Sequence, residues 1–491
     1  MLNNVFYFDK LIWQYEYMKK IVLMISFFLV SGCGSTVSIS PEEPPQTSVP
    51  DTPIFNPNPI ILEDGISYYS KACNNPSFQF LIPVHINDDN FVDFIAHFWC
   101  DSETPSEISY ENVPDALVVY LSDSNGNYVT NNQDIFGELY PKLGGASRKY
   151  ARGDINGDGK DDFAFAMNAE DGRAAYDEET VQTNYAYPAI LLSTVSGYEV
   201  IKLGEKDWGH SVQIKNNEAL FGGHRSQAFK YMNSNMVDIS ETYKELSFAS
   251  FLVYEDFIVN SVRKDKRQGL ELVRDNKIIS SVMKNEIFKV YFEAWNNTGT
   301  GNYEKIGVYE YRNEYYFHGM TTEMCRKDDL IIATINASKP IDREIIENEY
   351  YSQNETTPVV LFSFYKIKND ELLEENISIN GEESNHNFNF FSCFDVNQDN
   401  KKDIVAQVFS QAWNEQSPNN KGIPEIYLNS GNSEYYNLDT SSWPVFSEND
   451  DSQGYLYDVN QDGTQDLIMF PLKANFTANV EIYLSNRNID N

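Results

Sequence analysis

The sequence predicts an all-β fold in which a unit of about 60 residues recurs around one axis. Three observations support this prediction. An acidic nine-residue loop occurs in three close copies, short apolar segments flank each copy, and a second apolar motif recurs along the chain. Short strands repeated with such a period form small sheets, one in each unit. The spacing of these motifs along the chain predicts seven units between residues 61 and 491.

The bulk composition is globular but acidic. The chain has 491 residues, of which 41% are hydrophobic, and its formal net charge is -36. This length is sufficient for a substantial core. A surface this negative repels phosphate backbones and attracts cations, so no nucleic-acid partner is expected.

The N-terminal segment has the pattern of a secretion signal. From Met18 the sequence reads MKKIVLMISFFLVSGCGS, with two lysines followed by an apolar run, Ile21 to Val30, that is too short to span a membrane. Its end, VSGC, resembles the lipobox of bacterial lipoproteins, in which the cysteine, here Cys33, is lipidated. The alternative is an ordinary signal peptide with an incidental cysteine.

Three regions follow from this pattern. Residues 1–33 are the expected lipoprotein signal peptide, with Met18 as the expected start, and residues 34–60 form a Pro/Ser/Thr-rich linker. Residues 61–491 form the folded domain. Gly34 is not the aspartate that retains enterobacterial lipoproteins at the inner membrane. We therefore expect an outer-membrane lipoprotein, on its periplasmic or cell-surface face, with the membrane as a partner through Cys33.

Four cysteines remain after Cys33: Cys73, Cys100, Cys325 and Cys393. An even number in an exported chain permits two disulfides in three pairings. The pair Cys73 and Cys100 is the most local choice. Free buried thiols are the alternative.

The acidic loop carries oxygen-bearing side chains at its positions 1, 3, 5 and 9. The three close copies are Asp154, Asn156, Asp158 and Asp162; Asp395, Asn397, Asp399 and Asp403; and Asp458, Asn460, Asp462 and Asp466. A weaker copy has His85 at position 1, followed by Asn87, Asp89 and Asp93.

These loops are not EF-hands. An EF-hand needs a glutamate at position 12 and a helix on each side. Position 12 is Phe165, Ala406 or Met469, and the flanking segments, such as FAFAM and NFNFFSCF, indicate strands. We therefore expect each loop to join two strands.

The second motif is an apolar strand that ends in a polar turn. Its seven expected copies begin at Pro114, Pro188, Ser250, Gly307, Pro358, Pro424 and Val480. The segment VYFEAWNN, from Val290, echoes VFSQAWNE, from Val408. This echo predicts that Trp99, Trp295 and Trp413 occupy equivalent packing positions between units.

Together these motifs resemble the FG-GAP/VCBS repeats of the integrin α-subunit head and of bacterial surface proteins, over about residues 60 to 491. The resemblance implies a seven-bladed β-propeller with Ca²⁺ bound in loops within blades, and middle blades that have lost the metal. It also implies a ligand role for the position-7 carbonyl oxygens of Lys160, Lys401 and Thr464.

The ligand chemistry agrees with calcium. Three carboxylates, one amide oxygen and a carbonyl make an all-oxygen set that suits Ca²⁺ better than Mg²⁺ or Zn²⁺. Bound Ca²⁺ would stabilise the blades by mass action. The alternative is acidic turns without metal, and it has most weight for the loop with Asn87, Asp89 and Asp93.

No catalytic motif stands out. The sequence contains no GxSxG, HExxH or P-loop, and GGHRS, from Gly222, is the one Gly-rich stretch that combines a histidine and an arginine. We therefore expect a calcium-stabilised binding or adhesion scaffold with a protein or glycan ligand. The alternative is an exported polysaccharide lyase or hydrolase, which a cluster of His, Arg and Tyr at the channel would favour.

Overall fold

The structure is a computed structural model of the chain. It divides into two compact units, Met1–Pro50 and Asp51–Asn491, and the residues that it describes all belong to the second. They are residues 54–62, 76–87, 89–100, 115–139, 141–169, 185–246, 248, 250–264, 267–284, 290–297, 303–311, 322–327, 329–340, 356–380, 388–408, 423–444, 452–471 and 479–486.

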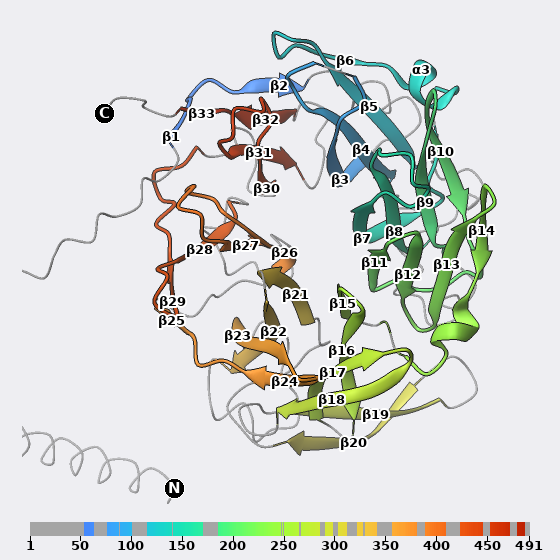
Figure 1. Cartoon of the computed structure of the whole chain (residues 1–491), viewed down its shortest axis with the longest axis vertical. Helices are drawn as coiled ribbons and strands as arrows, with labels where there is room; N and C mark the ends of the chain where they lie inside the picture. The colour runs from blue at the N-terminus through green and yellow to red at the C-terminus, as the bar shows by residue number, and fades with distance from the viewer. Residues whose placement is uncertain are drawn as a thin grey trace, which may run out of the picture. The chain divides into compact units, whose positions relative to one another are not determined.

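Seven sheets of four or five strands are arranged in a ring, which is the architecture of a seven-bladed β-propeller (Figure 1). This confirms the predicted fold class. Blades 1 to 3 are β3 (Pro76–Val84), β4 (Asp93–Cys100), β5 (Ala116–Ser122) and β6 (Tyr128–Thr130); β7 (Ala146–Gly153), β8 (Asp162–Ala169), β9 (Ala189–Thr194) and β10 (Gly197–Lys202); and β11 (Ser211–Lys215), β12 (Glu218–Gly222), β13 (Ser226–Met232) and β14 (Asn235–Asp238).

Blades 4 to 6 continue the same antiparallel order. They are β15 (Phe251–Tyr254), β16 (Phe257–Lys264), β17 (Arg267–Arg274) and β18 (Lys277–Lys284); β21 (Thr322–Lys327), β22 (Leu330–Pro340), β23 (Thr356–Lys368) and β24 (Glu371–Glu374); and β26 (Phe388–Phe394), β27 (Asp403–Val408), β28 (Glu425–Asn429) and β29 (Glu434–Asn437). A fifth strand, β25 (Ser378–Asn380), adds to blade 6 in parallel with β29.

Blade 7 closes the ring with strands from both ends of the fold. Its inner strands are β30 (Ser452–Tyr457), β31 (Asp466–Pro471) and β32 (Val480–Tyr483), and its outermost strand is β2 (Ile60–Leu62), which pairs antiparallel with β32. Nearby, β1 (Ile54–Phe55) pairs with β33 (Ser485–Asn486). Residues 54–60, which the sequence placed at the end of the linker, are therefore part of the folded structure.

Besides β1, β33 and β25, four described elements lie outside the meanders. The strands β19 (Val290–Asn297) and β20 (Tyr303–Tyr311) form a separate two-stranded sheet between blades 4 and 5. A short helix, α3 (Asn132–Phe136), follows blade 1, and a 3-10 turn, Ser240–Tyr243, follows blade 3. No helix among the described residues is long and apolar enough to cross a membrane.

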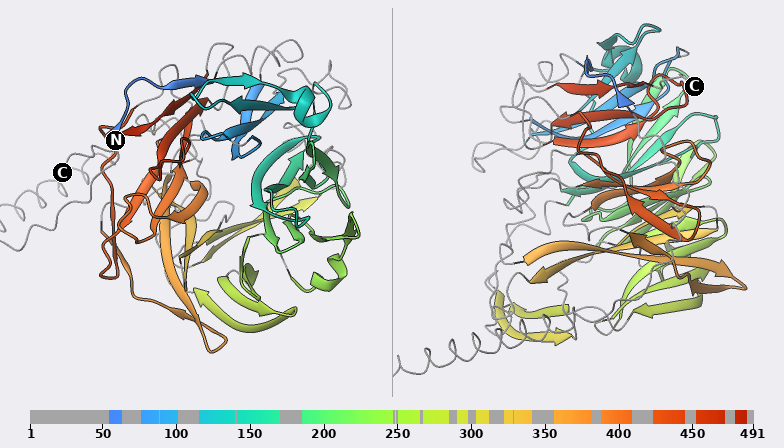
Figure 2. Two further views of the ribbon diagram at one scale, coloured as in Figure 1. Left: turned by 45° about the horizontal axis from the view of Figure 1, so that its top comes forward. Right: turned by 90° about the vertical axis from the view of Figure 1, so that its left-hand side faces the viewer.

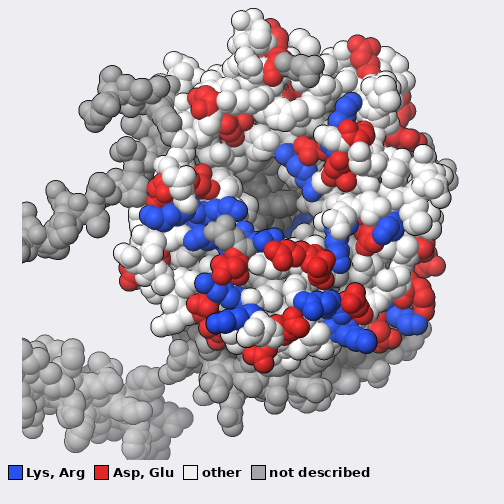
Figure 3. Space-filling model, viewed as in Figure 1, with Lys and Arg blue, Asp and Glu red and all other residues white. Residues whose placement is uncertain are grey.

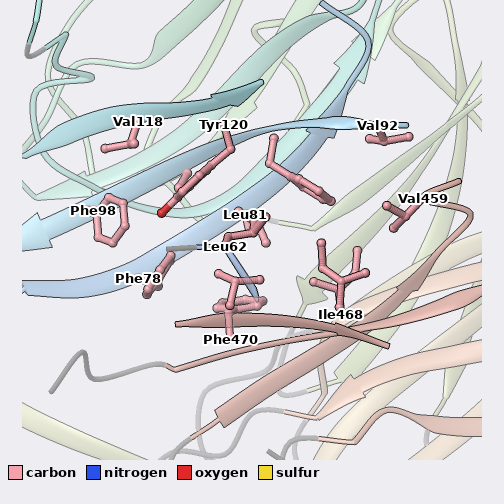
Figure 4. Close-up of a cluster of buried hydrophobic side chains, with 14 of the residues drawn as sticks. Leu62, Phe78, Leu81, Val92, Phe98, Val118, Tyr120, Val459, Ile468 and Phe470 are labelled. Carbon is pink, nitrogen blue, oxygen red and sulfur yellow. The ribbon is translucent and has the colours of Figure 1, made fainter. Parts of the chain in front are cut away.

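The hydrophobic core is distributed between the blades. The described residues form seven buried clusters, and each cluster joins two neighbouring blades. Figure 4 shows the cluster between blades 7 and 1, where Ile468 and Phe470 of β31 face Phe78 of β3. In β31 the alternate residues Leu467 and Met469 belong to the cluster with blade 6. Both faces of such a strand are buried, which explains apolar runs such as LIMF.

Most copies of the second motif are the third strands of blades. This holds for β5, β9, β23, β28 and β32; the other two copies are strands, as predicted, but they are not equivalent to these five. The copy from Ser250 is β15, the first strand of blade 4, and the copy from Gly307 lies in β20. Trp295 lies in β19, outside the seven sheets, so its predicted equivalence to Trp99 in β4 was wrong.

One disulfide lies between neighbouring blades. Cys325 in β21 is bonded to Cys393 in β26, so the bond joins the first strands of blades 5 and 6. The complementary pair would be Cys73 with Cys100, but Cys73 lies outside the described residues, as does Cys33.

Candidate metal centres

The four acidic loops occupy equivalent places in the fold. Each joins the first strand of a blade to the second, in blades 1, 2, 6 and 7, as predicted. Since successive strands of a meander run in opposite directions, the turns between first and second strands all lie on one face of the ring, which Figure 2 shows from the side. Connections between blades lie on the opposite face.

The aspartate at position 9 is a buried hydrogen-bond anchor in each loop. Its side chain is completely buried in all four copies, Asp93, Asp162, Asp403 and Asp466. One carboxylate oxygen accepts the backbone N–H of position 2, and the other accepts a backbone N–H at or just after the end of the third strand, at 2.6–2.9 Å. The donors are Ser122, Ser193 and Asn429 in the third strands and Ser485 in β33, two residues after the third strand of blade 7. The sequence did not reveal this role, because the partner lies 19 to 31 residues away.

The oxygens at positions 1 and 3 converge in the three close copies. In blade 2 the backbone N–H of Asp158 lies 3.1 Å from Oδ1 of Asp154 and 2.9 Å from Oδ1 of Asn156. In blades 6 and 7 the corresponding distances are 3.1 and 3.3 Å, and 3.0 and 3.2 Å. Three independent stretches of chain therefore adopt one loop conformation.

A left-handed backbone at positions 4 and 6 produces this conformation. The φ angles at position 6 are 84° at Gly159, 63° at Asn400 and 87° at Gly463. Glycine and asparagine are the residues that adopt this region most readily. The turn brings the carboxylate at position 5 to the backbone N–H of position 7 at 2.8–2.9 Å in all three loops.

The loop carboxylates repel each other. The pKa of Asp403 and of Asp466 is raised to about 6, mainly by burial; the charges of two further aspartates in each loop add to the rise, and backbone hydrogen bonds oppose it. The pKa of Asp458 is also raised, by burial and by the charge of Asp462, although hydrogen bonds from the loop backbone oppose the shift. A bound cation would remove this repulsion.

In two of the loops the residue at position 7 is a lysine, which supplies part of the positive charge that offsets this repulsion. Nζ of Lys401 lies 2.9 Å from Oδ2 of Asp399, and this hydrogen bond raises the pKa of Lys401. Nζ of Lys160 donates instead to the carbonyl oxygen of Thr194 at 3.1 Å. In blade 7 the residue at loop position 7 is Thr464, whose hydroxyl donates a hydrogen bond to Oδ1 of Asp462.

The loop in blade 1 keeps the buried aspartate at position 9, but its position 1 is a histidine instead of an aspartate. The Oγ of Ser122 lies 3.0 Å from Oδ1 of Asp89 and 2.9 Å from Oδ1 of Asp93, and Nδ2 of Asn87 donates to the carbonyl of Ser122. His85, at position 1, is exposed. The Ser122 hydroxyl lies within hydrogen-bond distance of both carboxylates, as the Ser193 hydroxyl does of Asp158 in blade 2.

Neighbouring loops contact one another through the glutamine at position 4. Nε2 of Gln398 in blade 6 donates to the carbonyl oxygen of Gly463 in blade 7. Nε2 of Gln461 in blade 7 lies 3.5 Å from the carbonyl oxygen of Asp89 in blade 1. The acidic loops of blades 6, 7 and 1 therefore form a continuous chain across the closure of the ring.

The donor chemistry of the close copies fits Ca²⁺, because every side-chain donor at positions 1, 3 and 5 is an oxygen and two of them converge. In the described part of the chain, however, no three or more Asp, Glu, His or Cys side chains are grouped in positions to hold one metal ion. In this conformation backbone N–H groups occupy the carboxylate oxygens. The three loops would therefore have to turn these oxygens inward to bind an ion.

Charged side chains of both signs surround the centre of one face of the ring, which is hollowed (Figure 3). Arg152, on the innermost strand of blade 2, donates to the hydroxyl of Tyr457 in blade 7 at 3.2 Å and to the carbonyl of Pro83 in blade 1. The hydroxyl of Tyr455 donates to the carbonyl of Leu81. These bonds tie three blades together at their inner strands.

The opposite face contains a group of residues that the sequence only hinted at. The GGHRS stretch forms the turn between β12 and β13, and it brings His224 and Arg225 beside Tyr185, Trp208 and His210. Only the combination of His and Arg in a Gly-rich turn signalled this group.

The comparisons with known proteins identify no family. No family model matches the chain, and no curated protein matches it. Similar solved structures include the β-propeller domain of the Trilobed protease from Pyrococcus furiosus, at 11% identity and a TM-score of 0.33, over 83% of this chain and 93% of that one. The WD40 β-propeller domain of Doa1 is 10% identical over 84% and 98%, with a TM-score of 0.35. The exotype rhamnogalacturonan lyase YesX is 10% identical over 88% and 75%, with a TM-score of 0.33.

Proposed function

We propose that this chain is a calcium-stabilised propeller of the FG-GAP/VCBS type that acts as a binding or adhesion scaffold for a protein or glycan. A lipid on Cys33 would hold it at the outer membrane, on the periplasmic or cell-surface face. The observation that carries the calcium part is the shared geometry of three loops, in which the side-chain oxygens of positions 1 and 3 meet at one backbone N–H.

The residues that would hold the ions are the aspartates and asparagines at positions 1, 3, 5 and 9 of the loops in blades 2, 6 and 7, with the position-7 carbonyls. A bound Ca²⁺ supplies positive charge that offsets the repulsion among these carboxylates. Because each loop is anchored to the third strand of its blade through position 9, ordering the loop also orders the strand end. The loops would thus stabilise the scaffold without taking part in chemistry.

The test is the calcium stoichiometry of the purified protein together with its melting temperature in calcium and in chelator. We expect about three ions per chain and a higher melting temperature in calcium. Asp462→Ala and Asp158→Ala should each remove one ion and lower the melting temperature more in calcium than in chelator, where only the hydrogen bonds of the carboxylate are lost. Asp256→Ala, at an exposed turn outside the loops, is the control. Equal losses in calcium and in chelator would show that the loops are not metal sites.

The anchor is tested separately. Cys33→Ser should abolish lipidation and release the protein from the membrane fraction, because one thioether-linked lipid group would be its attachment. A Cys33→Ser protein that stays in the membrane fraction would contradict the lipoprotein proposal, while leaving the calcium proposal unaffected.

The alternative function, an exported polysaccharide lyase or hydrolase, draws support from one observation. Tyr185, His210, His224 and Arg225 gather on the face opposite the acidic loops, and His210 directly precedes β11, the first strand of blade 3. Such side chains can serve as general acids, general bases and carboxylate-binding groups. Release of new chain ends from plant or bacterial polysaccharides, lost in His224→Gln, would favour this alternative over the scaffold.

A further inference from the structure

Three separate segments form the side-chain group on the face opposite the acidic loops. They are residues 185–188 before β9, residues 203–210 between β10 and β11, and the turn at residues 223–225. Backbone hydrogen bonds fix their relative positions. The N–H of Asp207 donates to the carbonyl of Ala186 at 2.9 Å, and the N–H of His210 donates to the carbonyl of Gly222 at 2.6 Å.

Asp207 connects the second and third of these segments. Its carboxylate is buried and accepts the backbone N–H of Trp208 at 2.8 Å and that of Arg225 at 2.7 Å. A buried carboxylate with two such bonds holds the turn at residues 223–225 firmly against the connection between blades 2 and 3. The side chains carried by these segments are therefore presented on a rigid backbone.

The two glycines of GGHRS are required by this packing. A Cβ on Gly222 would lie 1.4 Å from the carbonyl oxygen of Phe248, and one on Gly223 would lie 2.5 Å from Oδ2 of Asp207. Backbone segments can approach this closely only where no side chain intervenes. The glycines thus explain the sequence up to residue 223, but they do not explain why His224 follows and points outward.

The two histidines lie at a separation that suits a shared ion. The ring centroids of His210 and His224 are 5.6 Å apart, with an angle of 51° between the planes. Two imidazoles that each bind one zinc ion at about 2.1 Å have ring centroids about 5–6 Å apart. His224 is exposed and His210 is partly exposed, so an ion can reach both rings from solvent.

Tyr185 orients the exposed histidine. Its hydroxyl oxygen lies 3.0 Å from Nδ1 of His224, and its ring packs edge-on against the imidazole at 5.6 Å between centroids. A hydrogen bond at one imidazole nitrogen is the usual way in which proteins fix a metal-binding histidine, because it directs the other nitrogen toward the ion. When Nδ1–H of His224 donates to the hydroxyl oxygen of Tyr185, Nε2 is the unprotonated nitrogen and can bind a ligand.

The surrounding charges permit a cation here. The positive charge of Arg225, which adjoins His224 in the turn, is paired with the carboxylate of Glu205, and both groups are exposed. The ammonium of Lys206 lies over the ring of Tyr187, 5.4 Å from its centroid. The chain as a whole carries a net charge of -36, which raises the local concentration of cations.

We propose that His210 and His224 bind one divalent ion of the zinc, nickel or copper class, with Tyr185 as a positioning residue. Imidazole nitrogen selects such borderline ions, whereas the all-oxygen loops on the opposite face select Ca²⁺. Two histidines are fewer protein ligands than zinc sites usually have, so water completes the coordination and leaves positions for an incoming ligand. This site is independent of the calcium proposal and of the lipid anchor.

The test uses the full chain in buffer with excess Ca²⁺, so that any oxygen sites are filled. Zn²⁺ is titrated by calorimetry, and Cu²⁺ is added for electron paramagnetic resonance, which detects nitrogen ligands directly. We expect one equivalent of Zn²⁺ and a Cu²⁺ spectrum with two imidazole nitrogens. Binding should weaken as the pH falls, because imidazole must be neutral to bind.

Substitutions decide which residues bind. His224→Gln and His210→Gln should each weaken Zn²⁺ binding by more than about tenfold, and Tyr185→Phe by a smaller factor. Asp256→Ala, at an exposed turn in blade 4 outside both kinds of site, is the control and should bind as the unmodified chain does. Equal binding by all the variants would show adsorption to the acidic surface and would overturn the proposal.

A loss of binding through misfolding is distinguishable. His224 is exposed on a turn, so His224→Gln should melt at the same temperature as the unmodified chain when Zn²⁺ is absent. If that variant keeps its fold and its Zn²⁺ affinity, the proposal is wrong whatever His210→Gln does. A Cu²⁺ spectrum with oxygen ligands alone would overturn it as well.

Discussion

Asp93 allows the roles of position 9 and of the metal to be separated. Its carboxylate is fully buried at the start of β4 in blade 1. It accepts the backbone N–H groups of Ile86 at 2.7 Å, Asn87 at 3.1 Å and Ser122 at 2.8 Å, and also the Ser122 hydroxyl at 2.9 Å. This loop is also the one whose donors suit a metal least, since position 1 is His85. The effect of replacing Asp93 should therefore not depend on calcium.

The magnitude follows from the bonds that would be lost. In Asp93→Ala the N–H groups of Ile86 and Ser122, which form the two shortest backbone bonds, lose their acceptor inside the protein. Each buried donor left without a partner costs about 1–3 kcal/mol, so the free energy of unfolding should fall by about 2–6 kcal/mol. Asp93→Asn keeps one side-chain oxygen, so it should lose about half as much as the alanine variant.

Denaturant unfolding, followed by tryptophan fluorescence in calcium and again in chelator, measures this loss. We expect the same decrease under both conditions, and a change within about 0.5 kcal/mol for the exposed control Asp256→Ala. A decrease that appears only in calcium would refute the reasoning, because it would make Asp93 a metal ligand rather than an anchor. An Asp93→Ala protein as stable as the unmodified chain would refute it too.

Two further predictions concern blade 3. Burial alone would raise the pKa of Glu218, but hydrogen bonds from Lys230 and Tyr243 outweigh it and lower the pKa below 4.5. This stabilisation is present above pH 4.5 and is lost as the pH falls through the lower pKa of the folded state, so the melting temperatures of the unmodified chain and Glu218→Gln should converge in acid; a constant difference would contradict this. Gly222→Ala places a Cβ against the carbonyl oxygen of Phe248 and should cost about 3 kcal/mol or more, measured by denaturant unfolding, whereas a mild effect would mean that the turn can move freely.

The fold was predictable where local chemistry repeats. The acidic loops were recognisable in the sequence because each turn depends on residues within one nine-residue stretch. Gly159 in one loop and Asn400 in another adopt the left-handed conformation that the turn needs. The strands that follow them were recognisable because both of their faces are buried between blades. Seven units followed from the spacing of these features.

The middle of the ring was harder to predict for physical reasons. Blade 3, Ser211–Asp238, has short strands and tight turns without an acidic loop, so no motif marked it. The sheet of β19 and β20 lies between blades 4 and 5 and disturbs the period, which led to the wrong assignment of Trp295.

The candidate sites show the same limit. The residues at positions 1 to 9 of a loop could be read directly, but the partner of Asp162 at Ser193 could not, because it is fixed only when the third strand pairs. Likewise Tyr185, His210 and His224 come from three segments with no common spacing, and they meet because the backbone N–H and the carboxylate of Asp207 bond to the other two segments.

The way in which blade 7 closes also determines how the molecule would carry mechanical load. The expected linker runs directly into β1 and β2, and β2 is a strand of three residues that pairs only with β32 within the described structure. If a surface-bound ligand pulls the propeller away from a lipid at Cys33, the tension reaches this short strand before any other blade. We therefore expect the ring to open at blade 7 under force. Single-molecule pulling from the N-terminal side should show an early extension step that corresponds to the release of β1 and β2. The other six blades, which contain no strand from the N-terminal end of the fold, should stay folded during this step.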